Sequence, residues 1–555
     1  MNSDSTMNQP AWWKDGVVYQ IYPRSFQDSN GDGVGDLEGV IQRLDYLNDG
    51  TPASLGVDAI WLSPIYPSPM ADFGYDVSDY CAIDPVFGDL GAFDRLVAEA
   101  HRRGIRIILD MVFNHTSERH PWFLDSRSSR SSRRRDWYLW RAPKPGGKPP
   151  NNWQAAFGGS GWEWDEATGQ FYYHSFLKEQ PDLNWGNPEL RRAVHDSMRF
   201  WLDRGVDGFR LDVVHFFGKD REFRDNPRGL TGFTKGLISY DRYKHLYDRD
   251  RPEVHEVFRE MRKLTDAYPD RMMVGETPYE LGAEVATSYL GDGSDELHLA
   301  FYFKFLLARW SARGYRERLE RLYRAIPEKG WPCWVLNNHD MPRSTGRLSL
   351  PWEGDETRRN RARAAAMILL TLRGTPFLYY GEELGMRNGR IPREAIQDPM
   401  GKRYWPVYRG RDMARTPMQW DHTASAGFSS AAPWLPLNPD HDRVNVAAQA
   451  ADPRSVLSFY RELVWLRKNT RALQSGSLQW TEGLPESCLG FQRSLGTDTF
   501  QVLVNFSKAP VRFPAPCGAG SCRIVLSSHP EPVPQASLEA GQIRLRGLEG
   551  LILRT

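Results

Sequence analysis

Cysteine is scarce in this chain, with five residues among 555. The count is odd, and no pair has the spacing of a zinc site apart from a loose pair at Cys517 and Cys522. We therefore expect reduced thiols, as in a cytoplasmic protein. The start of the chain, MNSDSTMNQPAWWKDG, lacks a basic stretch followed by an apolar run, so the sequence predicts no secretory signal peptide.

Long apolar runs and a strong net charge are also missing. No segment reaches the roughly 18 consecutive apolar residues of a membrane span, so none is predicted. The 71 basic and 70 acidic residues nearly cancel, and a net charge of +1 offers no broad field for nucleic acid or anionic lipid. One basic run, SRSSRSSRRRD from Ser126, is interpreted as a solvated loop. We expect neither nucleic acid nor a membrane as a partner.

What the chain does contain is a series of short apolar runs that end in polar residues and alternate with helix-like stretches. Such runs are typical of buried parallel strands with crossover helices. Eight of them predict an α/β fold, a (β/α)8 TIM barrel, whose active site lies at the carboxyl ends of the strands. The runs begin at Val17, Val57, Ile105, Val206, Arg271, Glu296, Cys333 and Pro376.

Two segments do not follow this alternation. Residues 116–176 are rich in Trp, Gly, Ser and Pro, and a structureless loop of this length is uncommon, so a small inserted domain is predicted after the third strand. After about residue 480 the pattern changes to short alternating runs with turns, which predicts a C-terminal antiparallel β domain, a β-sandwich, over 480–555. The barrel then comprises 1–115 and 177–479.

Polar residues gather at the predicted strand ends in a pattern that suits glycosidic bond cleavage. Retaining cleavage needs two carboxyl groups about 5–5.5 Å apart, one as nucleophile and one as acid and base. Asp212 lies two residues after Arg210 on one strand, so both side chains point to the same face. Glu276 ends the next strand and can face Asp212. Asp340, next to His339, could bind sugar hydroxyls and favour distortion of the ring.

Several motifs give this chain a clear resemblance. It resembles the α-amylase family of glycoside hydrolases, family 13, in its oligo-1,6-glucosidase and α-glucosidase branch, over nearly its whole length. The motifs are DMVFNH from Asp110, GFRLDVVH from Gly208, VGET from Val274, NNHD from Asn337, QPDLNW from Gln180 and GRDMARTPMQW from Gly410. The resemblance implies Asp212 as the nucleophile, Glu276 as the acid/base and Asp340 as the stabiliser of the transition state.

The resemblance also implies a pocket for one terminal glucose. By position, it implies that the pocket uses Asp72, Tyr75, His115, Arg210, His339 and Arg411, with Tyr75 stacked on the sugar. Phe157 and Phe176 are predicted walls of the pocket, with packing in the core as the alternative. In similar enzymes a Val after the nucleophile, here Val213, accompanies α-1,6 linkages. Simple packing of Val213 is the alternative.

Two positions depart from the family pattern. Phe113 stands where relatives usually carry Val or Ala, and it either narrows the pocket or packs in the core. His215 stands where relatives often have Asn. A histidine there could titrate near neutral pH, but a structural histidine is the favoured interpretation.

A candidate metal loop, DSNGDGVGD, begins at Asp28. Oxygen ligands are predicted from Asp28, Asn30, Asp32, Asp36 and the carbonyl of Val34, spaced as at the start of an EF-hand loop. No helix precedes the loop and its twelfth position is Gly39, so it is not an EF-hand. The resembling branch holds a structural calcium in a similar loop. We expect Ca²⁺, with Mg²⁺ as the second candidate; a polar turn that caps the following helix is the alternative.

The predicted function is therefore a retaining exo-acting α-glucosidase that acts on short oligosaccharides and favours α-1,6 bonds. The alternatives are a glucosyl transferase, a sucrose-active enzyme and an α-1,4-preferring maltase, since water and sugar hydroxyls can attack the same intermediate. A non-catalytic scaffold is disfavoured because the three carboxylates are intact. A monomer or a small homo-oligomer is expected.

Overall fold

The computed structural model describes residues 11–231, 236, 238–515, 522–531, 538–539 and 541–555. Its centre is an eight-stranded parallel sheet with the strand order β10-β11-β1-β2-β3-β7-β8-β9. A parallel bridge between Phe301 and Cys333 joins the two ends of this sheet and closes the barrel. The strands are β1 (Val18–Ile21), β2 (Ala59–Leu62), β3 (Arg106–Met111), β7 (Gly208–Leu211), β8 (Met272–Gly275), β9 (Leu299–Ala300), β10 (Cys333–Val335) and β11 (Thr375–Tyr379). Seven of the strands lie within the predicted runs and β11 begins one residue before its run, so the predicted fold is confirmed.

The crossover helices surround the barrel because each presents one apolar face to the sheet. In α4 (Leu90–Arg102), the Asp89 side chain caps the first turn by accepting a hydrogen bond from the amide of Ala92, and Phe93 and Leu96 are buried. Further helices around the barrel are α1 (Trp12–Asp15), α2 (Leu37–Gln42), α3 (Leu44–Leu47), α6 (Pro188–Asp203), α7 (Val254–Asp266), α8 (Ala283–Ser288), α9 (Phe303–Leu306), α10 (Ala312–Ala325), α11 (Ser344–Arg347), α12 (Asp355–Thr371), α13 (Pro399–Tyr404), α14 (Val446–Ala450), α15 (Val456–Lys468) and α16 (Arg471–Gln474).

The segment between β3 and β7 has a sheet and a core of its own. It contains α5 (Pro121–Ser128), β4 (Trp140–Arg141), β5 (Trp162–Asp165) and β6 (Gln170–Tyr173), and the sheet order is β4-β6-β5. Aromatic side chains, including Trp153 and Trp162, form its small core. The basic run is only partly solvated, since Arg135 is buried with its guanidinium 3.5 Å from the centre of the Trp140 ring.

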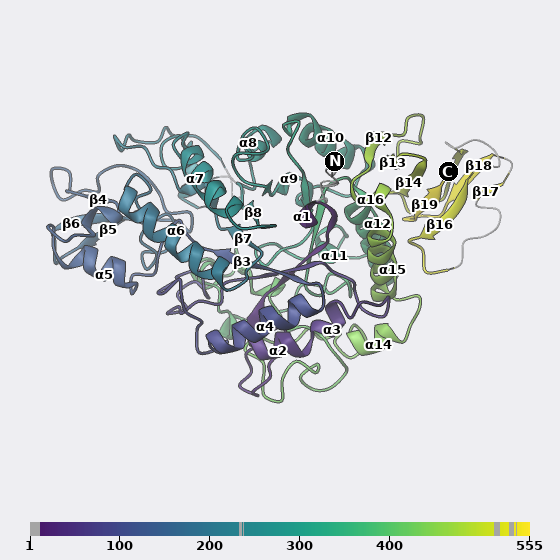
Figure 1. The fold of residues 1–555 in the computed structure, drawn as a ribbon, viewed down its shortest axis with the longest axis horizontal. Coiled ribbons are helices and arrows are strands. Elements are labelled where there is room, and N and C mark those ends of the chain that lie inside the picture. Colours follow the sequence, from purple (N-terminus) through teal and green to yellow (C-terminus); the bar gives the residue numbers. More distant parts are fainter. Residues whose placement is uncertain (1–10, 232–235, 237, 516–521, 532–537, 540) are drawn as a thin grey trace, which may run out of the picture.

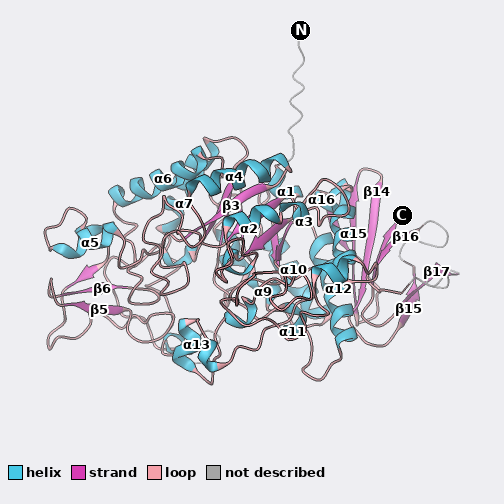
Figure 2. Ribbon diagram, turned by 90° about the horizontal axis from the view of Figure 1, so that it is seen from below, coloured by secondary structure: helices cyan, strands magenta, loops and turns pink. Residues whose placement is uncertain are grey.

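The C-terminal strands form two antiparallel sheets at the end of the molecule opposite the inserted segment (Figures 1 and 2). One sheet has the order β12-β13-β14-β19-β16 and the other β15-β18-β17. Buried Arg493 ties the first sheet to the barrel by donating hydrogen bonds to the carbonyls of Thr371 and Leu473. The strands are β12 (Ser477–Trp480), β13 (Cys488–Leu495), β14 (Asp498–Asn505), β15 (Val511–Pro514), β16 (Arg523–Ser527), β17 (Leu538–Glu539), β18 (Gln542–Leu545) and β19 (Gly550–Arg554).

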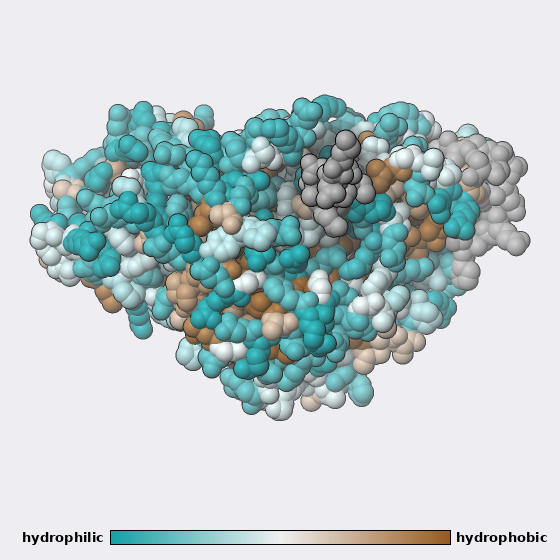
Figure 3. Space-filling view, in the orientation of Figure 1, coloured by the Kyte–Doolittle hydropathy of each residue, from teal (hydrophilic) through white to brown (hydrophobic). Residues whose placement is uncertain are grey.

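The cysteines differ in part from the prediction of reduced thiols. Cys81, Cys333 and Cys488 are free, but Cys522 is disulfide-bonded, so the prediction is wrong for Cys522. Cys517 lies outside the described residues. No helix in the described ranges has the length and apolar character needed to cross a bilayer, and the face in Figure 3 is dominated by hydrophilic residues.

Candidate active site

Three carboxyl groups at the strand ends share one buried arginine. Asp110 in β3 and Arg210 in β7 are register partners, so their side chains meet on the same face of the sheet. Arg210 donates hydrogen bonds to Asp110 Oδ1 at 2.6 Å and to Asp212 Oδ1 at 2.7 Å, and it also bonds Glu276. The amide of Glu276 donates to the carbonyl of Leu211, which aligns the end of β8 with Asp212. The barrel register thus places the predicted carboxyl pair side by side.

The two members of this pair differ in how they hold a proton. Burial, together with the nearby negative charge of Asp212, raises the pKa of Glu276 to about 8 against the opposing effect of Arg210. A hydrogen bond joins the two carboxyl groups, and it lowers the pKa of Asp212 while raising that of Glu276. Burial raises the pKa of Asp212 too, but the bonds from Arg210 and Glu276 favour its ionised form. The shared proton therefore resides on Glu276.

The location of the shared proton on Glu276 predicts how activity depends on pH. A form with one proton on the pair can both attack and protonate, so kcat/KM for an oligosaccharide is expected to fall above about pH 8, when Glu276 loses its proton. On the acid side, kcat/KM falls when the second proton neutralises Asp212. Initial rates at low substrate concentration across pH 4–10 test this, with stability checked at each pH. A rate that stays level to pH 10 would contradict the assignment.

A second charged network surrounds Asp340 and Asp72. Arg411 donates to Asp72 Oδ1 at 2.6 Å and to Asp340 Oδ1 at 3.3 Å, and its Nε donates to Asp398 at 2.7 Å. Arg415 adds a bond of 2.9 Å to Asp340 Oδ1. Burial opposes ionisation of Asp340, but the surrounding positive groups, including Arg411 and Arg415, hold its pKa below the usual range. Asp340 is therefore a fixed negative charge beside the pair.

Tyr75, His115 and His339 form a neutral polar base under the pocket. The Tyr75 and His339 rings stack at 5.4 Å and 5°, and a hydrogen bond of 2.6 Å joins the Tyr75 hydroxyl and His339 Nε2. His115 Nε2 lies 3.0 Å from the carbonyl of Tyr75. Burial lowers the pKa of His115 to about 4 and that of His339 to about 3, so both are neutral at physiological pH. Neutral imidazoles can bind hydroxyls as either donor or acceptor.

These groups line a pocket of about 310 Å³. The predicted residues Asp72, Tyr75, His115, Phe157, Phe176, Asp212, Val213, Glu276, Asp340 and Arg411 all contribute to its lining. Arg210 and His339 lie beneath and hold lining residues in place through the bonds described above. The structure thus brings the predicted catalytic carboxylates and most of the predicted sugar-binding side chains to one cavity, with Arg210 and His339 outside its lining.

The aromatic wall of the pocket is built from the inserted segment. Phe157 and Phe176 meet edge to face at 5.4 Å, and the Arg411 guanidinium lies 5.3 Å from the centre of the Phe157 ring. The Tyr404 hydroxyl in α13 donates to the carbonyl of Phe157 at 2.9 Å. Val213 packs beside this wall and has a φ of 38°, a left-handed conformation that is strained for a β-branched residue.

The structure shows where Phe113 and His215, the two residues that depart from the family pattern, lie. Phe113 is fully buried, packs at 5.1 Å from the Tyr80 ring and does not belong to the pocket lining, so it packs in the core. His215 does line the pocket. Burial, together with Arg249, holds the pKa of His215 well below its usual value, so it does not titrate near neutral pH. The favoured structural interpretation of His215 agrees with this environment.

Other lining residues were not predicted from the sequence. Arg249, Glu280, Tyr240 and Tyr279 contribute to the pocket, and Asp398 anchors Arg411 from behind. They lie in loops, where no periodic pattern marks a side chain as facing the site. The one available signal was proximity in sequence, because Tyr279 and Glu280 follow Glu276 in the same loop.

The predicted metal loop is tightly folded by its own hydrogen bonds. Asp28 Oδ1 accepts from the amides of Asn30 and Gly31, and Asp36 Oδ1 caps α2 by accepting from the amide of Gly39 at 2.7 Å. Asp32 Oδ1 accepts from the amide of Val34, and Asn30 Oδ1 from that of Asp32. No cluster of three or more His, Cys, Asp or Glu side chains suited to a metal occurs among the described residues. The predicted donor set depends on amide and carbonyl oxygens as well.

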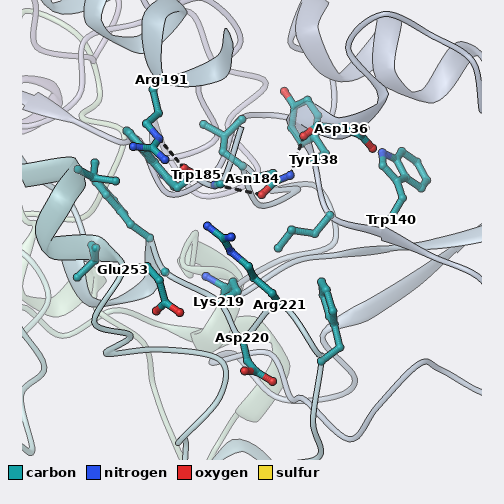
Figure 4. Close-up of a pocket in the computed structure, with 18 of the residues that line it drawn as sticks. Asp136, Tyr138, Trp140, Asn184, Trp185, Arg191, Lys219, Asp220, Arg221 and Glu253 are labelled. Atoms are coloured by element: carbon teal, nitrogen blue, oxygen red, sulfur yellow. Dashed lines mark hydrogen bonds between the residues drawn. The ribbon is translucent and has the colours of Figure 1, made fainter. Parts of the chain in front are cut away.

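A second cavity, of about 350 Å³, lies between the inserted segment and the starts of α6 and α7 (Figure 4). Two of its charged lining residues, Asp220 and Lys219, are bonded to neighbouring residues. Arg224 lowers the pKa of Asp220, and the Lys219 ammonium lies 2.9 Å from Asp182 and also bonds the carbonyl of Phe216. A proton donor needs a raised pKa near the working pH, and the carboxyl pair with that property lies in the other pocket.

A closed parallel barrel whose strand ends hold an arginine-linked carboxyl pair in a pocket of this size defines a glycoside hydrolase. The model of the alpha-amylase catalytic domain matches residues 20–476. The chain therefore belongs to the alpha-amylase family.

Sequence relatives and a solved structure match most of the chain. A probable alpha-glucosidase of Rhizobium meliloti (strain 1021) is 46% identical over 503 residues, which is 89% of each chain. An oligo-1,6-glucosidase of Parageobacillus thermoglucosidasius is 40% identical and covers 98% of this chain and 99% of its own. The solved structure of an alpha-glucosyl transfer enzyme matches with a TM-score of 0.90 at 40% identity, covering 98% of this chain and 100% of that chain.

Proposed function

We propose that the protein is a retaining, exo-acting α-glucosidase that releases single glucose units from the non-reducing ends of short oligosaccharides, with a preference for α-1,6 bonds. The observation that carries this proposal is the carboxyl pair joined by one proton at the base of a small pocket. Such a pocket fits the end of a chain better than its middle. The alpha-glucosidase and oligo-1,6-glucosidase relatives support the substrate class.

The proposed reaction has two steps. In the first, an Asp212 oxygen bonds the anomeric carbon while the glycosidic oxygen leaves with the proton of Glu276, which gives a covalent glucosyl ester. In the second, Glu276 removes a proton from water, whose oxygen displaces Asp212 and restores the original anomeric configuration. Asp340 is placed to stabilise positive charge on the ring in both transition states, since its own charge is fixed by Arg411 and Arg415.

The glucose ring is proposed to be held by the residues beneath and beside the pair. Asp72 and Arg411 are placed to bind vicinal hydroxyls, because their bond of 2.6 Å fixes an acceptor and a donor side by side. His115 supplies a neutral hydrogen-bonding group and Tyr75 an aromatic surface, while His339 supports Tyr75 from beneath through its bond to the Tyr75 hydroxyl. Phe157 and Phe176 exclude water from the outer wall.

Glucosyl transfer is the second candidate, and the similar transfer enzyme supports it. The glucosyl ester can be attacked by a sugar hydroxyl instead of water, with the same residues in the same roles. Product analysis at high sugar concentration gives the ratio of glucosyl transfer to hydrolysis, which distinguishes a transferase from a hydrolase.

The linkage preference is tested by comparing kcat/KM for isomaltose and maltose. We expect isomaltose to be preferred by about tenfold, a difference of about 1.4 kcal/mol, which is within the effect of one side chain such as Val213 on the leaving sugar. The Asp212→Asn variant serves as the control for contaminating activity. A preference for maltose would leave the chemistry unchanged and assign linkage choice to the loops. Failure to cleave either sugar would remove the proposed function.

We propose further that Asp28, Asn30, Asp32, Asp36 and the carbonyl of Val34 bind Ca²⁺, with Mg²⁺ as the alternative. Hard oxygen donors of this kind suit both ions, and the alternating spacing supports the proposal. None of these residues lines the pocket of the carboxyl pair, so the metal would stabilise the fold and take no part in the reaction.

Removal of the metal is expected to lower the melting temperature by about 2 °C or more, and added Ca²⁺ should restore it. Asp32→Asn should weaken the response. Asp49→Asn is the matched control, because Asp49 forms the same kind of turn with the amide of Thr51 outside the loop. An unchanged melting curve, with no metal detected by elemental analysis, would remove the claim.

A cytoplasmic location and a monomeric or small homo-oligomeric state stay predictions of the same proposal. Cell fractionation and light scattering of the purified chain test them.

A further inference from the structure

An ion pair that the reaction above does not use lies in the pocket wall. Arg249 Nη1 lies 2.6 Å from Glu280 Oε1, and both residues contribute to the lining. The Arg249 side chain is 8% exposed and that of Glu280 is 26% exposed. The contact with Arg249 uses Oε1 of Glu280, whose carboxylate has a second oxygen, Oε2, as a further acceptor. The pair therefore presents an acceptor to the pocket with a guanidinium held beside it.

Neighbouring side chains contact Arg249 from behind. Arg249 Nη1 also donates to the Tyr240 hydroxyl at 3.1 Å, and the Tyr240 ring stacks on His245 with centroids 3.6 Å apart. Arg249 Nε lies 3.6 Å from Asp250 Oδ2, whose other oxygen accepts from Tyr289. A guanidinium fixed by three neighbours loses little further freedom when it binds a ligand.

Stability gives a poor account of this arrangement. The adjoining lining includes the apolar side chains of Phe216, Ile238 and Met400. An ion pair among apolar groups costs desolvation energy, and apolar residues of similar size are often at least as stabilising. Polar groups at defined positions in a pocket wall are typical of ligand orientation.

The position of the pair points to the part of the substrate that it meets. Glu276 gives its proton to the leaving oxygen, so the departing sugar must lie against the loop that carries Glu276. Glu280 belongs to that loop, four residues further along the chain. The bound glucose, in contrast, is assigned to the side of Asp72, Arg411 and Asp340.

We propose that Arg249 and Glu280 bind two neighbouring hydroxyls of the departing sugar, with Glu280 as the acceptor and Arg249 as the donor. By microscopic reversibility, the same pair binds an acceptor sugar that attacks the glucosyl ester. This inference rests on the proposed glucosidase function. It assigns recognition of the departing and accepting sugar to a charged pair in addition to Val213.

The test compares isomaltose with α-glucosyl fluoride, whose leaving group has no hydroxyls for the pair to bind. We expect Glu280→Gln to lower kcat/KM for isomaltose about tenfold to a hundredfold more than kcat/KM for α-glucosyl fluoride, the loss expected for a hydrogen bond to a charged group. Transfer of glucose from the fluoride to added glucose should fall relative to hydrolysis. Arg249→Met should act in the same direction, and the double variant should lose less than the product of the single losses.

Glu222→Gln is the matched control, since Glu222 is an exposed carboxylate near Arg224 in the loop after β7. Melting temperatures show whether each variant is folded, and Arg249→Lys provides a variant that retains the charge if Arg249→Met is not folded. Equal losses for both substrates, or no loss for isomaltose, would overturn the inference. If the unmodified protein cleaves neither substrate, the proposed function fails instead, and the two failures are distinguishable.

Discussion

Replacement of Asp212 by Asn is expected to reduce kcat for isomaltose by about 10⁴-fold or more, the scale of loss seen when a covalent nucleophile is removed. The amide is nearly the same size and can still hydrogen-bond, but it cannot form the glucosyl ester. The fold should tolerate the change, because burial of Asp212 as an anion is itself unfavourable. The variant should keep its affinity for glucose, which calorimetry measures.

The matched control for this experiment is Asp196→Asn, which removes an exposed carboxylate paired with Arg199 in α6. Its activity should stay at the wild-type level. A second experiment tests the assignment of Asp212 by adding a small external nucleophile, azide, to an Asp212 variant with α-glucosyl fluoride as the substrate. Azide needs the space of the lost carboxylate, which the Asn amide still fills, so this experiment uses Asp212→Gly, in which azide should attack once and yield the β-glucosyl azide. Retention of more than about one hundredth of the activity in Asp212→Asn would assign the nucleophile elsewhere.

Replacement of Glu276 by Gln is expected to have a strongly substrate-dependent effect. Isomaltose needs a proton on its leaving oxygen, so its kcat/KM should fall by about 10³-fold or more, within the contribution of general acid catalysis. The fluoride ion of α-glucosyl fluoride leaves with little need for a proton from a general acid. Formation of the glucosyl ester from this substrate should therefore be much less affected. The ester should then accumulate, because no base activates water, and intact-protein mass spectrometry should detect a glucosyl adduct on Asp212.

The same variant should lose the fall of kcat/KM above about pH 8, since the group that titrates there is gone. Azide should rescue the second step and give the α-glucosyl azide, the opposite configuration from that expected for Asp212→Gly. Equal losses for isomaltose and the fluoride would show that Glu276 acts mainly by holding Arg210 rather than by proton transfer. The two azide products therefore distinguish the roles of the two carboxyl groups.

Much of the barrel could be predicted from the sequence because its strands are short, apolar on both faces and ended by polar residues. The carboxyl pair followed from the same pattern, since period-two alternation places Arg210 and Asp212 on one face and the barrel register aligns Glu276 with them. Phe157 and Phe176 were ambiguous because an aromatic wall and an aromatic core have the same composition.

The rest depends on contacts between segments distant in sequence. Arg411 meets Asp72 across more than 300 residues, and its role as a bridge to Asp340 and Asp398 has no local signature. The Arg249–Glu280 pair joins two irregular loops, where neither period nor propensity indicates direction. The bonded state of Cys522 was missed because an odd number of cysteines argued against pairing.

The left-handed backbone at Val213 has a consequence for laboratory evolution. A β-branched residue in this conformation costs on the order of 1–3 kcal/mol, which Gly or Asn would largely recover. A library selected only for heat resistance would therefore enrich replacements at this position. The strained peptide directs the amide of Val213 towards Glu276 Oε2, 3.4 Å away. The enriched variants would therefore gain stability but lose the fixed orientation of this amide beside the nucleophile. Selections for more thermostable variants of this barrel should therefore keep Val213 unchanged.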